Sequence, residues 1–525
     1  MPNFCRAILL GLTLCAHVQA VMTIIVVTGS DAVANGQNFQ AALNTAVPGD
    51  IIVLQAGASY KGPFTLPAKD AGNWITIQSS EVGSLPLGMR VGPSQAGAMP
   101  RVFVPGVNNG LSGSVVATVA GAQGYRFIGI EITTDKAVRS LVSLGSGTET
   151  SISALPKRFS FDRCYFHGSA GFGSRAGIRL NAVDVTVVNC YFSNLKSWLG
   201  ESQALLGWNS PGPFWIENNY LEAATENIMF GGADPTIPGL VPADITILRN
   251  HFYKPLSWRG TNLVIKNLFE LKNARRVRAE GNVFENIWLA DQKGFAIQFT
   301  PSPGSVVEDV TFVNNIVRHA SAGINMLGRD DLQVSEQLKR MLIRNNLFVD
   351  VSHVNWGGRM PPEQSGRLFQ LSNGTQDVTI DHNTAFQTRA VVFAGGAAHQ
   401  GYVHTNNISP HNSCATSNNC GISGVGTNPG IPTLNLYFFS AVPERNVMFQ
   451  GNENGMWSYY GINYFPPSVD FNPDYSLAVT PGNNPYFRAC WHADRTFHNP
   501  PRTLGADLAA VYAATSGVVQ VFTTP

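Results

Sequence analysis

The stretch VTVVNCYFSN at 185–194 recurs along the chain with variations, and this recurrence decides the fold. In each copy, apolar residues occupy every second position before a small polar residue, a period that strands have and helices lack. Each copy therefore predicts a strand followed by a bend. The clearest further copies are ITILRNHFYK at 245–254, VTFVNNIVRH at 310–319, MLIRNNLFVD at 341–350 and VTIDHNTAFQ at 378–387.

The bend residues of nine copies between Phe159 and Pro410 define one column, at intervals of 24 to 37 residues. Such a repeat is typical of a solenoid. Asparagine suits the bend because it tolerates the left-handed backbone region, and stacked amides can hydrogen-bond along a column. A β-sandwich with Asn-rich hairpins is the alternative, but it would not keep one column. The column consists of Cys164, Cys190, Asn219, Asn250, Asn282, Asn315, Asn346, Asn383 and Asn407.

The composition fits a β-rich protein with many turns: 44% of the 525 residues are hydrophobic and 13% are charged, with 52 glycines and 31 prolines. A single core rarely grows beyond about 250 to 300 residues, whereas a solenoid extends by adding coils. The formal net charge is +1, and no lysine or arginine run occurs. These features argue against a nucleic-acid partner, which would need a concentrated basic surface.

Residues 1–20 have the pattern of an export signal. Arg6 precedes the apolar stretch 7–16, and VQA ends at Ala20 like a signal-peptidase site. An uncleaved membrane anchor is the alternative, because apolar residues resume at 21–27. We predict cleavage, no stable membrane span afterwards, and a monomeric bacterial protein that is secreted or periplasmic.

The cysteines allow two disulfides. Cys414 and Cys420 lie in a polar loop and could pair in an oxidising compartment. Cys164 and Cys190 occupy the bend column of adjacent coils, where backbones stack about 4.8 Å apart, within the reach of a disulfide. Cys490 has no evident partner. No pairwise metal-ligand spacing occurs, so we assign no metal ligands.

Helical spacing flanks the repeats. In NFQAALNTAVPGDIIVLQAG at 38–57, apolar residues recur at i, i+3, i+4 and i+7 from Phe39, and GADLAAVYAATSG at 505–517 shows similar spacing. Such helices can cap the ends of a stack. The expected organisation is a signal peptide (1–20), an N-terminal cap with the first coils (21–110), a parallel β-helix (111–410), and C-terminal loops with a capping helix (411–525).

The opening NFQAALNTAVPGDIIVLQAGASYKGPFTLP, the repeated xNNxF coils and the closing GADLAAVYAAT resemble bacterial secreted right-handed parallel β-helix proteins of the pectin-lyase-like superfamily, over about residues 22–517. NLFELKNARRVRAEGNVFENIW at 267–288 resembles a pattern of members without an established activity. The resemblance implies an all-β, right-handed parallel β-helix with an N-terminal capping helix and a short C-terminal helix. This fold includes pectate, pectin, alginate and chondroitin lyases, polygalacturonases and non-catalytic surface proteins, so it does not by itself select a function.

A second strand-like run follows each bend. If Ile228, Phe269 and Ile297 face the core, the residues after them face outward. Proteins of the resembled fold commonly bind substrate against such a strand face, so we expect a polysaccharide groove here. The outward column reads Arg179, Met229, Glu270, Gln298, Asn325 and Gln370, with Lys272, Thr300 and Ser372 beside it.

Two long connections reach the same coils. One carries Trp258 and Arg259, and the other carries Trp356 and Arg359. Tryptophan faces stack on sugar rings, and arginine binds carboxylates, so we expect these four residues and Asp330 to contact substrate. The alternative is that outward polar residues are simply solvated and that the loop tryptophans pack on the coil below.

β-Elimination on a uronic-acid polymer is the expected chemistry. It needs a base for the proton beside the carboxylate and a cation for the enolate-like charge that develops. Lys272 is the candidate base. The resemblance to alginate and chondroitin lyases adds Arg318 as the acid and Glu270 as a catalytic partner, and it allows calcium as a cofactor.

Two alternatives stay open. Hydrolysis needs two carboxyl groups about 5 to 9.5 Å apart, which Asp330 and Asp331 could offer, although the paired aspartates and GHG-like motif of polygalacturonases are missing. A polysaccharide-binding or structural surface protein would use the same groove without catalysis. Scattered side chains would favour binding, whereas convergence of Lys272, Glu270 and a loop arginine or aspartate would favour catalysis.

Overall fold

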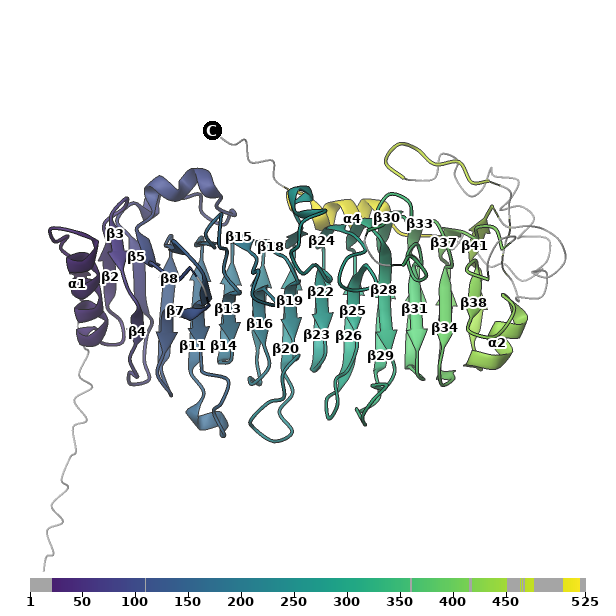
Figure 1. Cartoon of the computed structure of the whole chain (residues 1–525), viewed down its shortest axis with the longest axis horizontal. Coiled ribbons are helices and arrows are strands. Elements are labelled where there is room, and N and C mark those ends of the chain that lie inside the picture. Colours follow the sequence, from purple (N-terminus) through teal and green to yellow (C-terminus); the bar gives the residue numbers. More distant parts are fainter. Residues whose placement is uncertain are drawn as a thin grey trace, which may run out of the picture.

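The computed structural model describes residues 21–108, 110–358, 361–414, 418–450, 463, 465, 468–475 and 504–519. It shows one elongated stack of coils (Figure 1). Helix α1 (Ala32–Thr45) lies at the N-terminal end of the stack and α2 (Ile431–Tyr437) at the other end. The expected signal peptide, residues 1–20, lies outside the described residues.

Successive coils add strands to three parallel sheets, which gives the right-handed parallel β-helix that the sequence predicts. We call them sheets A, B and C in the order in which the chain visits them within a coil. Sheet A comprises β1 (Thr23–Ile25), β2 (Ile51–Leu54), β5 (Ile75–Ser79), β8 (Gln123–Ile128), β11 (Lys157–Asp162), β14 (Val183–Val188), β17 (Phe214–Glu217), β20 (Ala243–Leu248), β23 (Ala274–Glu280), β26 (Val307–Val313), β29 (Lys339–Arg344), β32 (Gln376–Asp381), β35 (His399–Gln400), β36 (Val403–Thr405), β39 (Phe438–Phe439) and β40 (Val442–Glu444).

Sheets B and C follow sheet A around each coil. Sheet B comprises β3 (Ser59–Lys61), β6 (Arg101–Val104), β9 (Glu131–Thr134), β12 (Tyr165–His167), β15 (Tyr191–Leu195), β18 (Tyr220–Ala223), β21 (His251–Tyr253), β24 (Val283–Ile287), β27 (Ile316–Ala320), β30 (Leu347–Val351), β33 (Thr384–Gln387), β37 (Ile408–Pro410) and β41 (Val447–Phe449). Sheet C comprises β4 (Phe64–Leu66), β7 (Ser112–Thr118), β10 (Val138–Leu144), β13 (Ala176–Leu180), β16 (Gln203–Gly207), β19 (Glu226–Phe230), β22 (Phe269–Leu271), β25 (Phe295–Phe299), β28 (Ala322–Leu327), β31 (Phe369–Ser372), β34 (Val392–Gly395) and β38 (Ile422–Gly424).

Short 3-10 helices lie in the connections, at η1 (Val82–Ser84), η2 (Pro93–Ala98), η3 (Ile152–Ala154) and η4 (Leu256–Trp258). In the described part of the chain, no helix is long and apolar enough to cross a membrane.

The predicted bend column is confirmed as a continuous amide ladder between sheets A and B. Asn250 donates from Nδ2 to Oδ1 of Asn282 at 3.1 Å and to the carbonyl oxygen of Ile216 at 2.9 Å. Its backbone N–H also donates to Asn282 Oδ1, at 2.9 Å. The side chain of each amide therefore joins one coil to the next. The asparagine ladder comprises Asn219, Asn250, Asn282, Asn315, Asn346, Asn383, Asn407, Asn446 and Asn463.

The left-handed backbone conformation falls on the residue before the column, so our assignment of it to the column asparagine was wrong. Asn189, Asn218 and Arg249 have φ values of 57°, 53° and 55°. Each precedes a column residue and turns the chain from sheet A into sheet B. The column residue itself points its amide inward along the stack, where it satisfies buried backbone groups.

Cys164 and Cys190 extend the column toward the N-terminus as free, buried thiols, so the disulfide that we considered between them is not present. The backbone N–H of Cys164 donates to Cys190 Sγ at 3.4 Å, and Cys190 Sγ donates to the carbonyl oxygen of Val188 at 3.1 Å. Both thiols thus take the hydrogen-bonding role of the asparagines. Cys414 and Cys420 form the other predicted disulfide, with Cα atoms 5.3 Å apart. Cys490 lies outside the described residues.

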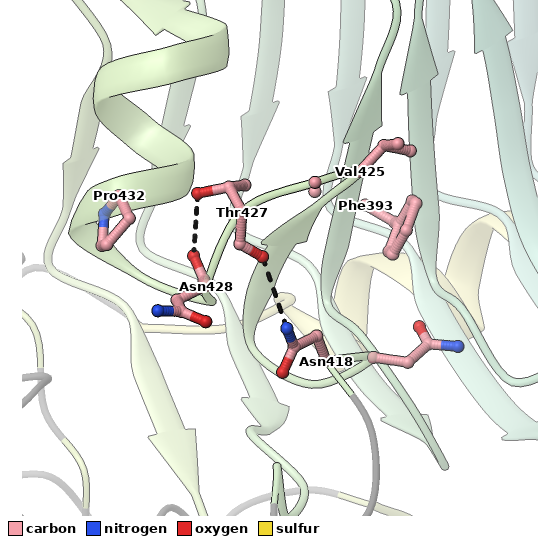
Figure 2. Close-up of a pocket in the computed structure, with 9 residues that line it drawn as sticks. Phe393, Asn418, Val425, Thr427, Asn428 and Pro432 are labelled. Atoms are coloured by element: carbon pink, nitrogen blue, oxygen red, sulfur yellow. Dashed lines mark hydrogen bonds between the residues drawn. The ribbon is translucent and has the colours of Figure 1, made fainter.

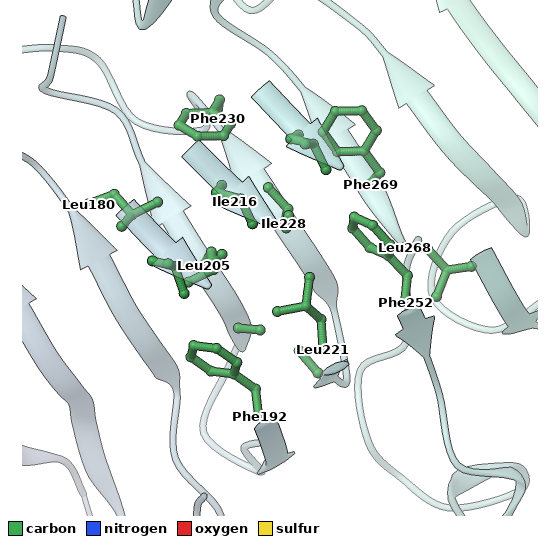
Figure 3. Close-up of a cluster of buried hydrophobic side chains, with 14 of the residues drawn as sticks. Leu180, Phe192, Leu205, Ile216, Leu221, Ile228, Phe230, Phe252, Leu268 and Phe269 are labelled. Atoms are coloured by element: carbon green, nitrogen blue, oxygen red, sulfur yellow. The ribbon is translucent and has the colours of Figure 1, made fainter. Parts of the chain in front are cut away.

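Inward residues of the three sheets fill the coils with a continuous apolar core (Figure 3). Like side chains stack from coil to coil, as in Phe166–Phe192 and Phe252–Phe284, whose ring centroids are 4.5 Å and 4.3 Å apart. Burying one such side chain contributes about 1.5 to 3 kcal/mol. The core therefore holds the coils in register and fixes which residues face outward.

Helix α1 covers the N-terminal end of this core with Phe39 and Leu43, and Asp31 caps it by accepting hydrogen bonds from two backbone N–H groups. The expected C-terminal helix forms as α4 (Leu508–Thr515), but it does not cap the stack. It lies along the flank, where Leu508 and Val511 pack on Leu347 of sheet B. The apolar outward residues of sheet B at this place explain the position, because α4 removes them from water.

Arg90 ties distant parts of the chain together on the same flank. Its side chain is 3% exposed; Nε donates to the carbonyl oxygen of Asn218 at 3.0 Å, and Nη1 donates to that of Val518 at 2.8 Å. A third bond runs from Nη2 to the carbonyl oxygen of Arg249 at 3.3 Å. Burial lowers the pKa of Arg90 to about 9. One guanidinium thus joins the loop before η2, two coil bends and the segment after α4.

Candidate functional site

The register of sheet C places the expected outward residues on consecutive strands. Glu270 on β22 pairs with Gln298 on β25, Gln298 with Asn325 on β28, and Asn325 with Gln370 on β31. Paired residues lie about 4.8 Å apart across the strands. Leu206 stands between Arg179 and Met229, in a coil that our column skipped.

Three neutral side chains of this column form what we call the outer amide row: Gln298, Asn325 and Gln370. Gln370 Nε2 donates to Asn325 Oδ1 at 3.1 Å, and Asn325 Nδ2 donates to Gln298 Oε1 at 3.0 Å. Gln370 is 8% exposed and the other two are half-buried. The row thus presents pre-oriented amide groups along the outward face of sheet C.

Glu270 and Lys272 form an ion pair next to the outer amide row. Lys272 Nζ lies 3.1 Å from Glu270 Oε1; the side chain of Glu270 is 1% exposed and that of Lys272 is 29% exposed. Asn267 Nδ2 donates to Glu270 Oε2 at 2.8 Å, and Thr300 Oγ1 donates to Glu270 Oε1 at 3.4 Å. A buried carboxylate needs such partners. Lys272 is therefore the accessible end of a fully supported pair.

A second charged group, which the sequence analysis missed, adjoins this pair. Lys266 Nζ lies 3.5 Å from Oε1 of the fully buried Glu226 and also pairs with Glu201. Burial, and then the negative charge of Glu270, raises the pKa of Glu226 to about 7. The charges of Glu226 and Glu201 raise the pKa of Lys266 although burial opposes them. We call Glu201, Glu226, Lys266, Glu270 and Lys272 the Glu270 cluster.

A fully buried lysine supports the corner beneath the cluster. Lys254 Nζ donates to the carbonyl oxygens of Ala223, Ala224 and Thr225 at 2.7, 2.9 and 2.8 Å, and to Asn227 Oδ1 at 3.1 Å. Burial lowers the pKa of Lys254 to about 7. The four acceptors hold the chain between β18 and β19, which fixes Glu226 at the start of β19.

The structure places Arg318 on sheet B and does not bring it to Lys272. Arg318 lies on β27, where its Nη2 is 2.9 Å from Glu285 Oε2. His251 Nε2 lies 2.8 Å from the same oxygen. Burial would raise the pKa of Glu285, but His251 and Arg318 together lower it to about 2. The residue expected as the acid is thus engaged in a separate ion-pair group.

The loop tryptophans pack against the protein. Trp258 is 5% exposed and belongs to the core, and Trp356 is 8% exposed and donates from Nε1 to Asp350 Oδ2 at 2.6 Å. Arg259 donates to the carbonyl oxygens of Asn355 and Gly357 at 2.9 and 2.8 Å. These contacts stabilise the loops and leave neither ring face open for a sugar. Arg359 lies outside the described residues.

Two further expected contacts stand apart from the Glu270 cluster. Arg179 lies over the ring of Trp208 at 5.6 Å, and burial, followed by the charges of neighbouring arginines, lowers its pKa to about 10. Asp330 Oδ1 accepts from the backbone N–H groups of Leu332 and Gln333 at 2.9 and 3.0 Å, which makes it a loop-capping residue. Asp331, in contrast, accepts from Asn373.

The donor set does not fit calcium. Within the described residues, no group of three or more His, Cys, Asp or Glu side chains could hold a metal ion. The amide and carboxylate nearest Lys272, those of Asn267 and Glu270, bond to each other at 2.8 Å. Lys266 already pairs with Glu201 and Glu226. We therefore derive no step through calcium.

A cavity of about 680 Å³ opens where the outward face of sheet C reaches the C-terminal coils (Figure 2). Ligand sites commonly have volumes of about 300 to 1,000 Å³. Phe393 lines this cavity and pairs with Gln370 in the register of sheet C. Among the residues that the structure describes, none in the lining is ionisable. The lining comprises Phe393, Asn418, Asn419, Gly424, Val425, Gly426, Thr427, Asn428 and Pro432.

Neither a family model nor a curated protein matches the sequence. Among solved structures, the PL6 family alginate lyase AlyGC has 11% identity and a TM-score of 0.49, and the match covers 96% of this chain and 59% of that one. The catalytic unit of the GH87 α-1,3-glucanase of Streptomyces thermodiastaticus has 10% identity, a TM-score of 0.44, and coverage of 77% and 67%. DFA-IIIase of Arthrobacter chlorophenolicus has 11% identity, a TM-score of 0.40, and coverage of 85% and 100%.

These likenesses concern the fold, which the strand pairing already defines as a parallel β-helix. The chain spans about three fifths of the length of the alginate lyase AlyGC. The site must therefore be interpreted from its own residues.

Proposed function

We propose that this protein is a carbohydrate-active β-helix protein that binds an acidic polysaccharide along sheet C and cleaves it by β-elimination at the Glu270 cluster. The observation that carries the proposal is the Lys272–Glu270 pair at 3.1 Å, in which a buried carboxylate holds an accessible lysine next to the outer amide row. Amide groups bind sugar hydroxyls, and ammonium groups bind uronate carboxylates.

In this mechanism, the Lys272 ammonium first passes a proton to the Glu270 carboxylate 3.1 Å away, and the neutral Lys272 then accepts the proton next to the uronate carboxylate. The bond to the leaving sugar oxygen breaks, that oxygen takes up a proton from water, and the new end of the polymer is an unsaturated uronate. Lys266 supplies the positive charge that stabilises the enolate-like intermediate. The expected acid, Arg318, takes no part in this mechanism because it lies on sheet B. Export through residues 1–20 and a monomeric, secreted or periplasmic form belong to the same proposal.

The test is to incubate the protein with alginate, pectate and glycosaminoglycans and to measure the ultraviolet absorbance of the unsaturated uronates that form. Lys272→Ala should lower kcat by about 100-fold or more, the usual contribution of a positioned base. Lys266→Ala should lower kcat and raise KM, since the cation acts on the bound carboxylate and on the developing charge. Lys157→Ala, at an exposed lysine on sheet A, is the matched control and should leave both constants unchanged. Full activity in Lys272→Ala would reject Lys272 as the base.

Polysaccharide binding without cleavage is the second candidate, because Lys272 is ion-paired and Arg318 lies on another sheet. Affinity electrophoresis with the same polymers separates the two functions. Retardation without formation of unsaturated ends would establish binding alone, and Lys272→Ala should then weaken retardation only modestly.

A further inference from the structure

The cavity at the C-terminal end of sheet C differs chemically from the Glu270 cluster, although both lie on one strand face. Register leads from Glu270 through the outer amide row to Phe393 in four strand steps. At about 4.8 Å per step, the two sites lie on the order of 19 Å apart. A bound polymer chain can therefore reach both.

The lining combines amide and hydroxyl groups with apolar surface, and its described residues include no ionisable side chain. Asn418, Asn428 and Thr427 supply the polar groups, while Val425 is 57% exposed and stands with Phe393 at the cavity (Figure 2). A sugar ring offers hydroxyls around its rim and C–H groups on its faces. Amides match the hydroxyls in both hydrogen-bonding directions, and apolar side chains match the faces.

Arg367 is a cation that contacts two residues of the lining, Asn419 and Phe393. Arg367 is 7% exposed; Nη1 donates to Gln370 Oε1 at 2.6 Å, and Nε donates to Asn419 Oδ1 at 3.2 Å. Its guanidinium also lies 3.3 Å from the centre of the Phe393 ring. These contacts occupy Arg367 with protein partners, so it orients the lining and does not itself present a free charge to the cavity.

The walls are held in place before any ligand binds. The Cys414–Cys420 disulfide closes the loop that carries Asn418 and Asn419. From α2, Thr433 Oγ1 donates to the carbonyl oxygen of Asn428 at 2.8 Å. Tyr437, at the end of α2, donates from its hydroxyl to the carbonyl oxygen of Val425 at 2.7 Å. Such support reduces the entropy that binding must overcome.

We propose that this cavity is a binding subsite for an uncharged sugar ring. Taken with the proposed function, on which this second step rests, the polymer carries a uronate at Lys272 and a neutral sugar about four strand spacings away. The preferred substrate is then a heteropolysaccharide with charged and uncharged units, and a pure uronate homopolymer binds less well.

Titration calorimetry with neutral tetrasaccharides of gluco, manno and galacto configuration tests the subsite without any cleavage, with an acidic uronate tetrasaccharide for comparison. At least one neutral ligand should bind with an affinity that depends on Asn428, whereas binding of the acidic one at the Glu270 cluster should not depend on Asn428. Asn428→Ala should weaken neutral binding roughly fivefold, the usual effect of one lost hydrogen bond. Asn428→Trp, which places a bulky ring at the cavity, should weaken it at least about tenfold. Asn44→Ala, at an exposed asparagine of α1, is the matched control.

A Cys414→Ser/Cys420→Ser double variant adds a test of the wall. If its circular dichroism is that of the unaltered protein, neutral binding should fall because the loop carrying Asn418 loses its closure. Neutral binding that is absent, or unchanged in Asn428→Trp, would overturn the subsite. So would tighter binding of the acidic tetrasaccharide that is lost in Asn428→Trp.

The cleavage assay keeps the two proposals distinct. Activity that survives Lys272→Ala, together with neutral binding lost in Asn428→Trp, would reject the elimination mechanism and leave the subsite in place. The opposite pattern would reject the subsite alone.

Discussion

The asparagine ladder and the outer amide row share the same chemistry, one amide per coil, but have different roles. In the ladder, Asn250 and Asn282 are fully buried, and their amides bond both to the next amide and to backbone carbonyls. In the outer row, Asn325 bonds to its neighbours on sheet C but stays half-buried. Burial, and not residue type, thus decides whether a stack of amides holds the fold or remains accessible to a ligand.

The largest expected effect comes from breaking the ladder. Asn282→Ala leaves the backbone N–H of Asn250 and the carbonyl oxygen of Ile247 without their buried partner, which should lower the free energy of unfolding by about 3 kcal/mol. Gln298→Ala in the outer row should cost less than about 1 kcal/mol because water can replace the lost bonds. Urea denaturation measures both. Equal losses would contradict the distinction between the two stacks.

A smaller effect on the free energy of unfolding is expected at the Lys272–Glu270 pair, next to the outer amide row. Lys272→Ala leaves the carboxylate of Glu270 buried without its ammonium partner, and this should cost about 1 to 2 kcal/mol, since Lys272 itself is partly exposed. Adding Glu270→Gln removes the stranded charge and should restore most of the loss. Thermal unfolding of the two single variants and the double variant gives the coupling. Strictly additive losses would show that the pair does not act as a unit.

The pH dependence of stability tests the Glu270 cluster. The pKa of Glu226 is raised from 4.5 to about 7 in the folded chain. The folded state therefore favours the protonated form, and this contribution is complete below about pH 4.5 and is lost as the pH rises through about 7. Polar groups that face or influence Glu226 are Glu201, Gln203, Lys254, Lys266 and Glu270.

Unfolding of the unaltered protein and of Glu226→Gln, followed from about pH 4.5 to about pH 8, checks this sign. The unaltered protein should lose stability relative to the variant as the pH rises, because only its Glu226 must ionise in a buried place. Glu217→Gln, an acid on sheet A, serves as the control. Parallel curves for all three proteins would exclude Glu226 as the titrating group.

The smallest effect should come from lengthening the ladder by one amide. In Cys190→Asn, the new Nδ2 can donate to the carbonyl oxygen of Phe161, which Cys190 Sγ already contacts at 3.5 Å. The gain should be about 0.5 to 1.5 kcal/mol, the net contribution of one hydrogen bond. Cys164→Ala removes a thiol without offering an amide and should not stabilise the chain. A loss of stability in Cys190→Asn would mean that the column cannot accept an amide at that coil.

The fold could be predicted from the sequence because its signals are local. The alternation of apolar and polar residues and the one polar bend residue per repeat can be recognised without knowing how the side chains pack. The number of residues after a column residue such as Asn250 or Asn282 then defines which side chains point outward. The same count could have placed Arg318 on sheet B. It stands three residues after Asn315, as Glu285 stands three residues after Asn282, and this position belongs to sheet B.

The candidate site was harder to predict because its partners come from different coils. Glu226, Lys266 and Glu270 meet only after the bend between sheets B and C brings them together, and no spacing in the sequence marks that meeting. Trp258 illustrates the other difficulty: a loop tryptophan looks the same in sequence whether it faces a ligand or the core. The repeats in the sequence thus predict the fold, whereas the candidate site consists of residues that do not recur from coil to coil.

Arg90 has a consequence for biosynthesis. A solenoid can fold coil by coil during translation. The guanidinium of Arg90, however, bonds to the carbonyl oxygen of Val518, which is translated 428 residues later. A nascent chain halted before that point would lack this acceptor for Arg90. The early coils thus reach their full set of contacts only after the distant segment around Val518 has been translated.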